Sequence, residues 1–110
     1  MTLLEQMDRQ RLEDREHSRQ KVRRDLRDAL DQIIPGQRVV VFGSLVRSGK
    51  FNDYSDIDLA LESELPQMTV YQLISLLSER MGRTVDVILL DECPFREKIR
   101  REGELWMLRA

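Results

Sequence analysis

The sequence predicts a small mixed α/β (α+β) domain in which a long helix comes first and further helices pack on a short sheet. Residues 2–34 contain neither glycine nor proline. Three short runs rich in β-branched and aliphatic residues follow, at 38–42, 56–62 and 84–90, and each is typical of a strand. A run with helical spacing separates the second strand from the third, which favours a mixed or parallel sheet.

Composition bounds the class of protein. We expect one domain, residues 1–110, with a modest aliphatic core, because aromatic side chains make up only 5% of the chain. A net charge of −2 gives no basis for a surface that binds nucleic acid. The lone cysteine, Cys93, excludes an internal disulfide and favours a reducing compartment. No apolar stretch approaches the roughly 18 residues that span a bilayer, so we expect a cytoplasmic protein without membrane contact.

Residues 1–34 are predicted to form one long helix that ends at Pro35-Gly36. The segment between residues 9 and 20 has Leu12 as its only aliphatic side chain, so the core cannot cover it along its whole length. The sequence leaves two possibilities for the start of this helix, residues 3–7: it projects toward a partner, or it frays. Apolar residues recur at helical spacing in the second half: Val22, Leu26, Ala29, Leu30 and Ile33.

The remaining elements divide into a core, residues 38–90, and a C-terminal helix with a tail, residues 91–110. Within the core, Thr69 is the expected N-cap of a helix that ends at Met81-Gly82. After a turn at 91–94, a short helix is predicted over 95–101. Gly103 breaks it and leaves 104–108 as a terminal strand or an extended tail, which Trp106 is expected to pack onto the domain.

Three acidic residues interrupt the apolar runs. Asp56 and Asp58 are two residues apart on a predicted strand and therefore share one face, while Asp86 lies on the next strand. Adjacent carboxylates repel unless a cation lies between them, and magnesium is usually held by a few carboxylates together with substrate phosphates. The sequence thus predicts a Mg²⁺ site at Asp56, Asp58 and Asp86. The third carboxylate could bind a second ion or accept the proton of an attacking hydroxyl.

A Gly-Ser pair follows the first predicted strand. Gly43 allows a phosphate to approach the backbone closely, and Ser44 adds a hydroxyl donor. Arg47 could reach the same phosphates with its planar guanidinium. The pair therefore indicates a nucleotide-phosphate site made of Gly43, Ser44 and Arg47.

Each part also has a plainer interpretation. Ser55-x-x-Asp58 fits a capping box that would open a helix with surface acids. Gly43-Ser44 alone is an ordinary turn, and Asp86 alone is a charge at the edge of a strand. His17, the only histidine, is expected to be a surface residue of the charged helix. The site is favoured because three acids on two aliphatic strands coincide with an upstream Gly-Ser turn.

These residues together resemble the nucleotidyltransferase superfamily related to polymerase beta. The resemblance rests on Gly43-Ser44, Arg47, residues 55–59 and residues 85–87, and it runs from about Arg38 to Leu90. Residues 101–103 are similar to the family's C-terminal end. Eleven residues separate Ser44 from Asp56, one more than the family commonly has, and a loop tolerates such an insertion.

The chain is similar to the minimal nucleotidyltransferases (MNT), the antitoxins of HEPN/MNT (HepT–MntA) toxin–antitoxin pairs. The resemblance implies that Asp56 and Asp58 hold Mg²⁺ and that Asp86 helps to activate the acceptor. It further implies that Gly43, Ser44 and Arg47 hold a nucleoside triphosphate. The expected reaction moves AMP from ATP to a tyrosine hydroxyl of a cognate HEPN toxin, with pyrophosphate released.

Two other functions remain open alongside that adenylyltransferase. One is a binding module of the same fold that neutralises a partner by contact alone. The other is a nucleotidyltransferase subunit that modifies a small molecule. In each case we expect a partner protein that docks on the N-terminal helix. The sequence does not decide whether the assembly is a homo- or a hetero-oligomer.

Overall fold

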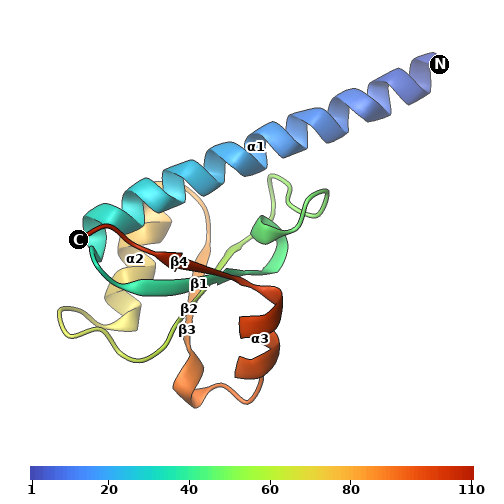
Figure 1. The fold of residues 1–110 in the computed structure, drawn as a ribbon. Coiled ribbons are helices and arrows are strands. Elements are labelled where there is room, and N and C mark those ends of the chain that lie inside the picture. The colour runs from blue at the N-terminus through green and yellow to red at the C-terminus, as the bar shows by residue number, and fades with distance from the viewer.

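A computed structural model of the chain describes residues 1–110 and shows the mixed α+β architecture that the sequence predicts. Figure 1 shows one long helix lying across a small sheet, with two shorter helices beside it. In chain order the elements are α1 (Leu3–Ile33), β1 (Arg38–Phe42), the 3₁₀ turn η1 (Gly43–Val46), β2 (Ile57–Leu61), α2 (Val70–Met81), β3 (Val85–Leu89), the 3₁₀ turn η2 (Leu90–Glu92), α3 (Arg96–Glu102) and β4 (Glu104–Met107).

The four strands form one mixed sheet in the order β3-β2-β1-β4. The pairs β1–β2 and β1–β4 are antiparallel, and β2 and β3 are parallel, with α2 as their crossover. The expectation of a mixed sheet is therefore confirmed. The segment left open as strand or tail is a strand, because β4 pairs with β1 along its length.

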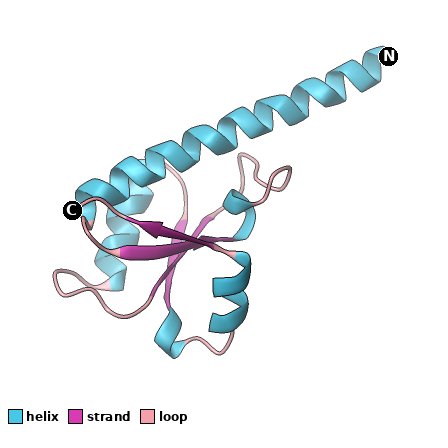
Figure 2. Ribbon diagram, in the orientation of Figure 1, coloured by secondary structure: helices cyan, strands magenta, loops and turns pink.

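The sheet has two unequal faces. Strand residues such as Leu59 and Val41 face the main core, which contains 17 buried residues and is completed by α1 and α2 (Figure 2). The opposite face carries a much smaller cluster of Val40, Ala60 and Leu90, against which Ile99 of α3 packs. Alternation along a strand places Asp58, two residues before Ala60, on this thinly covered face.

Helix α1 is the longest element and extends well beyond the sheet. Its 31 residues span about 46 Å at 1.5 Å per residue, which accounts for most of the molecule's 55 Å long axis. The second half packs on the core through Leu26 and Leu30, while the first half projects into solvent (Figure 1). The helix begins at Leu3, and Thr2 caps it in a capping box with Glu5.

The remaining boundaries follow local chemistry. Thr69 caps α2 in a capping box with Gln72, and Gly82 ends that helix in the left-handed conformation, as the sequence predicts. Trp106 is 4% exposed and packs β4 onto the core, which confirms its predicted role. The helix that a Ser55 capping box would have opened does not form, because residues 57–61 pair as a strand on both sides. None of the helices combines the length and apolarity needed to cross a membrane.

Candidate active site

Two of the three predicted acids lie side by side on neighbouring strands. Asp58 of β2 and Asp86 of β3 are direct partners in the parallel register. Adjacent strands are about 4.8 Å apart, and paired residues of a parallel ladder present their side chains on the same face. The two carboxylates therefore share the thin face of the sheet, at the end where both parallel strands begin. Asp86 is exposed and lies on an edge strand, whereas Asp58 is half-buried.

Asp56 precedes the strand in which the sequence placed it. The strand predicted over 56–62 forms only over Ile57–Leu61, so Asp56 belongs to the end of the incoming loop and is exposed. That loop is well anchored: Phe51 is buried, and Arg83 lies over its ring and donates a 2.9 Å hydrogen bond to the Ser55 carbonyl. Asp56 is thus presented from a fixed segment, two residues from Asp58.

The turn η1 packs directly against Asp58. Register pairs Phe42 with Asp58, so the next residue, Gly43, comes beside that carboxylate. Gly43 has a φ of +77°, which favours glycine, and a β-carbon added there would lie 3.3 Å from Asp58 Cγ and collide with its Oδ2. A glycine is therefore required twice, by the backbone conformation and by the neighbouring acid. Ser44 follows, half-buried, at the start of the 3₁₀ turn.

The electrostatics of the cluster concentrate on Asp58. Burial raises the pKa of Asp58, and the negative charges of Asp86 and Asp56 raise it further. No basic side chain forms an ion pair with any of the three carboxylates. Carboxylates without a basic partner are hard oxygen donors of the kind that divalent cations prefer, so the donor chemistry fits such an ion. The side chains are not gathered into a ready-made ligand set of three, and mutual repulsion of like charges favours that spread.

The three residues predicted to bind phosphate are not gathered in one place. Gly43 packs beside Asp58 and Ser44 follows it in the turn, but the Arg47 guanidinium pairs with Glu102 of α3 at 3.2 Å and is more than half exposed. Arg47 is thereby tied to the C-terminal end of α3 rather than to the carboxylates. The following Gly103 packs against β1 so closely that an added β-carbon would lie 2.7 Å from Val40 Cγ1 and 2.9 Å from the Val41 carbonyl oxygen. The 101–103 segment therefore contacts the turn through Glu102 and β1 through Gly103.

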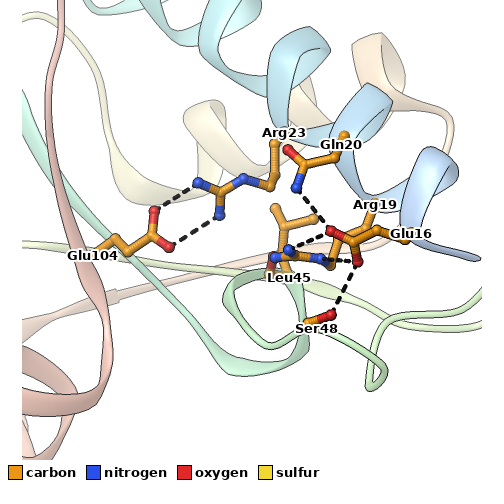
Figure 3. A network of polar contacts seen from close by, with 7 residues as sticks. All are labelled: Glu16, Arg19, Gln20, Arg23, Leu45, Ser48 and Glu104. Atoms are coloured by element: carbon orange, nitrogen blue, oxygen red, sulfur yellow. Dashed lines mark hydrogen bonds and ion pairs between the residues drawn. The ribbon is translucent and has the colours of Figure 1, made fainter.

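A polar network between α1 and the turn was not predicted from the sequence (Figure 3). Arg19 is buried in the middle of α1 and donates three hydrogen bonds: two to Glu16, at 2.9 and 2.8 Å, and one to the Leu45 carbonyl at 2.9 Å. Glu16 also accepts from Gln20 at 2.9 Å and from the Ser48 hydroxyl at 3.3 Å. Hydrogen bonds from Arg19 and Gln20 lower the pKa of Glu16 to about 2.

A signal for this network was present in the helical periodicity. Arg19 precedes Val22 by three residues and Leu26 by seven, so it occupies an apolar position of the helix stripe. A charge at a core position requires a partner, because an unpaired buried charge is costly. The partner could not be named in advance, since Leu45 offers a main-chain carbonyl that leaves no mark in the sequence.

One large concavity of the molecule does not include the three acids. Its volume is about 860 Å³, and it is bounded by the connection into α2, the first turns of that helix and the far end of β3. None of Asp56, Asp58 and Asp86 lines it, although Val87, the residue after Asp86, does. Asp56 and Asp86 are exposed, so the acid cluster is open to solvent.

Comparison with known protein families places the matched part of the chain over the sheet. A protein-family model described as a nucleotidyltransferase domain matches residues 23–109. The matched range includes β1 to β4, all three acids and the Gly-Ser turn, and it leaves the first 22 residues outside. None of the curated proteins matches the chain.

Proposed function

Because the chain belongs to the nucleotidyltransferase domain family, we propose that it transfers a nucleoside monophosphate, AMP from ATP, to a hydroxyl group of an acceptor. The observation that carries this proposal is the pairing of Asp58 with Asp86, with the Gly43 turn packed on Asp58. This arrangement joins a cation-binding surface to a glycine turn, and a metal-bound triphosphate needs both.

The three carboxylates are the proposed holders of Mg²⁺. Asp58 is central, because it adjoins both Asp86 and Gly43. A divalent cation bound there would neutralise the charge that develops on the transferring phosphate. Relief of the repulsion that raises the pKa of Asp58 would favour binding of the cation at neutral pH.

The protein's own groups then have distinct tasks. Gly43 gives the triphosphate close access to the backbone, and Ser44 offers a hydroxyl donor to a phosphate oxygen. Asp86, exposed on the edge strand, is placed to accept the proton of the acceptor hydroxyl. The acceptor oxygen forms a bond to the α-phosphorus as the bond to the bridging oxygen breaks, and pyrophosphate leaves with that electron pair.

A protein tyrosine is the acceptor we propose, on a HEPN-type toxin that the chain would silence as an antitoxin. Two observations support a protein partner. The acid cluster is open, so a side chain of another protein can reach Asp86. In addition, the projecting start of α1 exposes Leu3 and Leu4 at 71% and 73% and lies outside the family match, as an added docking element would.

That projecting helix also favours a second candidate, a module that neutralises its partner by contact alone. Contact would need α1 but not the acids. The two candidates therefore differ in whether Asp58 and Asp86 are required for neutralisation.

Transfer from labelled ATP tests the proposal. The chain is incubated with Mg²⁺, a HEPN-type toxin and ATP labelled either at the α- or at the γ-phosphate. Nucleotidyl transfer predicts that the α-label alone appears on a toxin tyrosine. Asp58→Asn should abolish labelling, whereas the matched control Asp53→Asn, in the exposed turn before the site, should leave it intact.

The other outcomes decide between the candidates. A stable, unlabelled complex that silences the toxin equally well with Asp58→Asn would establish the contact module. Label on a small-molecule hydroxyl in place of the toxin would establish a different acceptor. Persistent labelling by Asp58→Asn would overturn the assignment of the acid cluster.

A further inference from the structure

The turn that carries Gly43 and Ser44 is tied to α1 by a buried charged group. Arg19 is 9% exposed, the only buried charged residue of the chain. One guanidinium nitrogen donates to the Leu45 carbonyl at 2.9 Å, and Leu45 itself is fully buried. Arg19 and Leu45 are 26 residues apart in sequence, so their hydrogen bond fixes the turn against a separate element, helix α1.

Glu16 binds both Arg19 and the residues after the turn. It holds the Arg19 guanidinium in a two-bond pair and accepts from the Ser48 hydroxyl at 3.3 Å. Arg19 and Glu16 therefore bind the chain at two points, the Leu45 carbonyl and the Ser48 hydroxyl, on either side of Arg47 (Figure 3). Only three backbone hydrogen bonds outside the regular elements close the loop after η1, donated by Arg47, Lys50 and Ser55.

We infer that Arg19, oriented by Glu16, is a positioning residue that sets the phosphate-binding turn against Asp58. This inference rests on the proposed function, because it assigns the turn to the triphosphate. The guanidinium of Arg19 uses three separate nitrogens for Glu16 and the Leu45 carbonyl, whereas a lysine would have to reach both from a single nitrogen. Loss of the bond to the Leu45 carbonyl leaves the turn held by the buried Leu45 side chain, by the Ser48 hydroxyl on Glu16 and by the exposed pair of Arg47 with Glu102.

A neighbouring arginine supplies the matched control. Arg23, one turn further along α1, donates two hydrogen bonds to Glu104 of β4, at 3.2 and 2.8 Å, and none to the turn (Figure 3). Substitution of Arg23 also removes an ion pair between α1 and the sheet. It therefore controls for the stability lost with such an ion pair, while the hydrogen bond to the Leu45 carbonyl stays in place.

The experiment compares Arg19→Gln and Arg23→Gln by two readouts. Hydrogen exchange of the ligand-free chain measures how well the amides of 44–48 are held. Titration with ATP and Mg²⁺, below the melting temperature of each variant, measures nucleotide affinity. We expect Arg19→Gln to speed exchange at 44–48 and to weaken ATP binding about tenfold or more, as loss of a buried charge-assisted hydrogen bond implies. Arg23→Gln should change neither beyond about twofold, as expected for a tie away from the turn.

A second pair of variants, with lysine in place of each arginine, keeps the test valid if a glutamine variant does not fold. Arg19→Lys keeps the charge and much of the buried stem, and we expect it to weaken ATP binding as well, whereas Arg23→Lys should not. Equal exchange at 44–48, or equal ATP affinity, in the Arg19 and Arg23 variants would overturn the inference. If the unsubstituted chain itself fails to bind ATP, the proposed function fails, and the exchange readout alone then decides whether Arg19 holds the turn.

Discussion

Substitution of Gly43 by alanine separates the two demands that the structure makes at this position. The first is the backbone, which has a φ of +77°. The second is the Asp58 carboxylate, which occupies the space of a β-carbon. Gly49 is the matched control, since its φ is +80° and an added β-carbon would meet nothing within 4 Å. Gly49→Ala therefore reports the backbone cost alone.

The magnitudes follow from these two contacts. Left-handed backbone costs an L-residue roughly 1–2 kcal/mol, so both variants should lose up to that much stability. At about 4–8 °C per kcal/mol, the melting temperature falls by roughly 5–15 °C. Gly43→Ala should lose about a further 0.5–1.5 kcal/mol, because the Asp58 side chain must leave its rotamer or its place. Displacement of a site group by about 1 Å can cost on the order of 10²-fold in rate.

The assay combines thermal unfolding with α-label transfer from ATP to the toxin. We expect both variants to melt below the unsubstituted chain, and Gly43→Ala alone to lose transfer by about 10²-fold. Gly49→Ala should retain it within a few-fold. Transfer that survives equally in both variants would refute the reasoning, because it would show that the contact between Gly43 and Asp58 has no part in the chemistry.

Three further predictions concern stability. Burial and two neighbouring acids raise the pKa of Asp58, so in the absence of metal the stability that its protonated form gives is lost as pH rises through that value. Asp58→Asn should therefore melt higher than the unsubstituted chain at pH 7 without metal and match it below about pH 3.8; a lower melting point at pH 7 would contradict this. The pKa of Glu16 is lowered from 4.5 to about 2, so its contribution is complete above pH 4.5 and is lost as pH falls through 2. Glu16→Gln should cost about 1 kcal/mol at pH 7 by chemical denaturation, a value reduced for the partial exposure of the side chain, and progressively less as pH falls through about 2; a constant difference would be inconsistent with the pair. Gly103→Ala should cost roughly 1–3 kcal/mol through the contacts with Val40 and the Val41 carbonyl, and an unchanged denaturation midpoint would show that β1 yields there.

The parts of the fold that local chemistry determines could be predicted from the sequence. Thr69 and Gly82 delimit α2 by capping, and β-branched runs delimit the strands, so elements and their order were predictable. The acids were recognisable because carboxylates in aliphatic strands are rare. Their adjacency depends on the parallel register of β2 with β3, which the crossover helix made the favoured arrangement.

The parts that depend on distant contacts could not be predicted. The Leu45 carbonyl that Arg19 binds is a main-chain group and has no signature of its own. The pairing of Arg47 with Glu102 depends on where α3 ends relative to η1, a tertiary relation across 55 positions of sequence. The start of β2 was predicted one residue too early, at Asp56, because Ser55 is held in the anchored loop by Arg83.

Titration of ATP into the chain tests the central claim most directly: Asp58, its partner Asp86 and the Gly43 turn form one metal–nucleotide site. Heat of binding is measured with Mg²⁺ and with a chelator, for the unsubstituted chain and for Asp58→Asn. We expect saturable binding by the unsubstituted chain with Mg²⁺, at least about tenfold weaker binding with the chelator, and similar weakening in Asp58→Asn with Mg²⁺. Equal affinity in all these conditions, or no binding in any, would contradict the account.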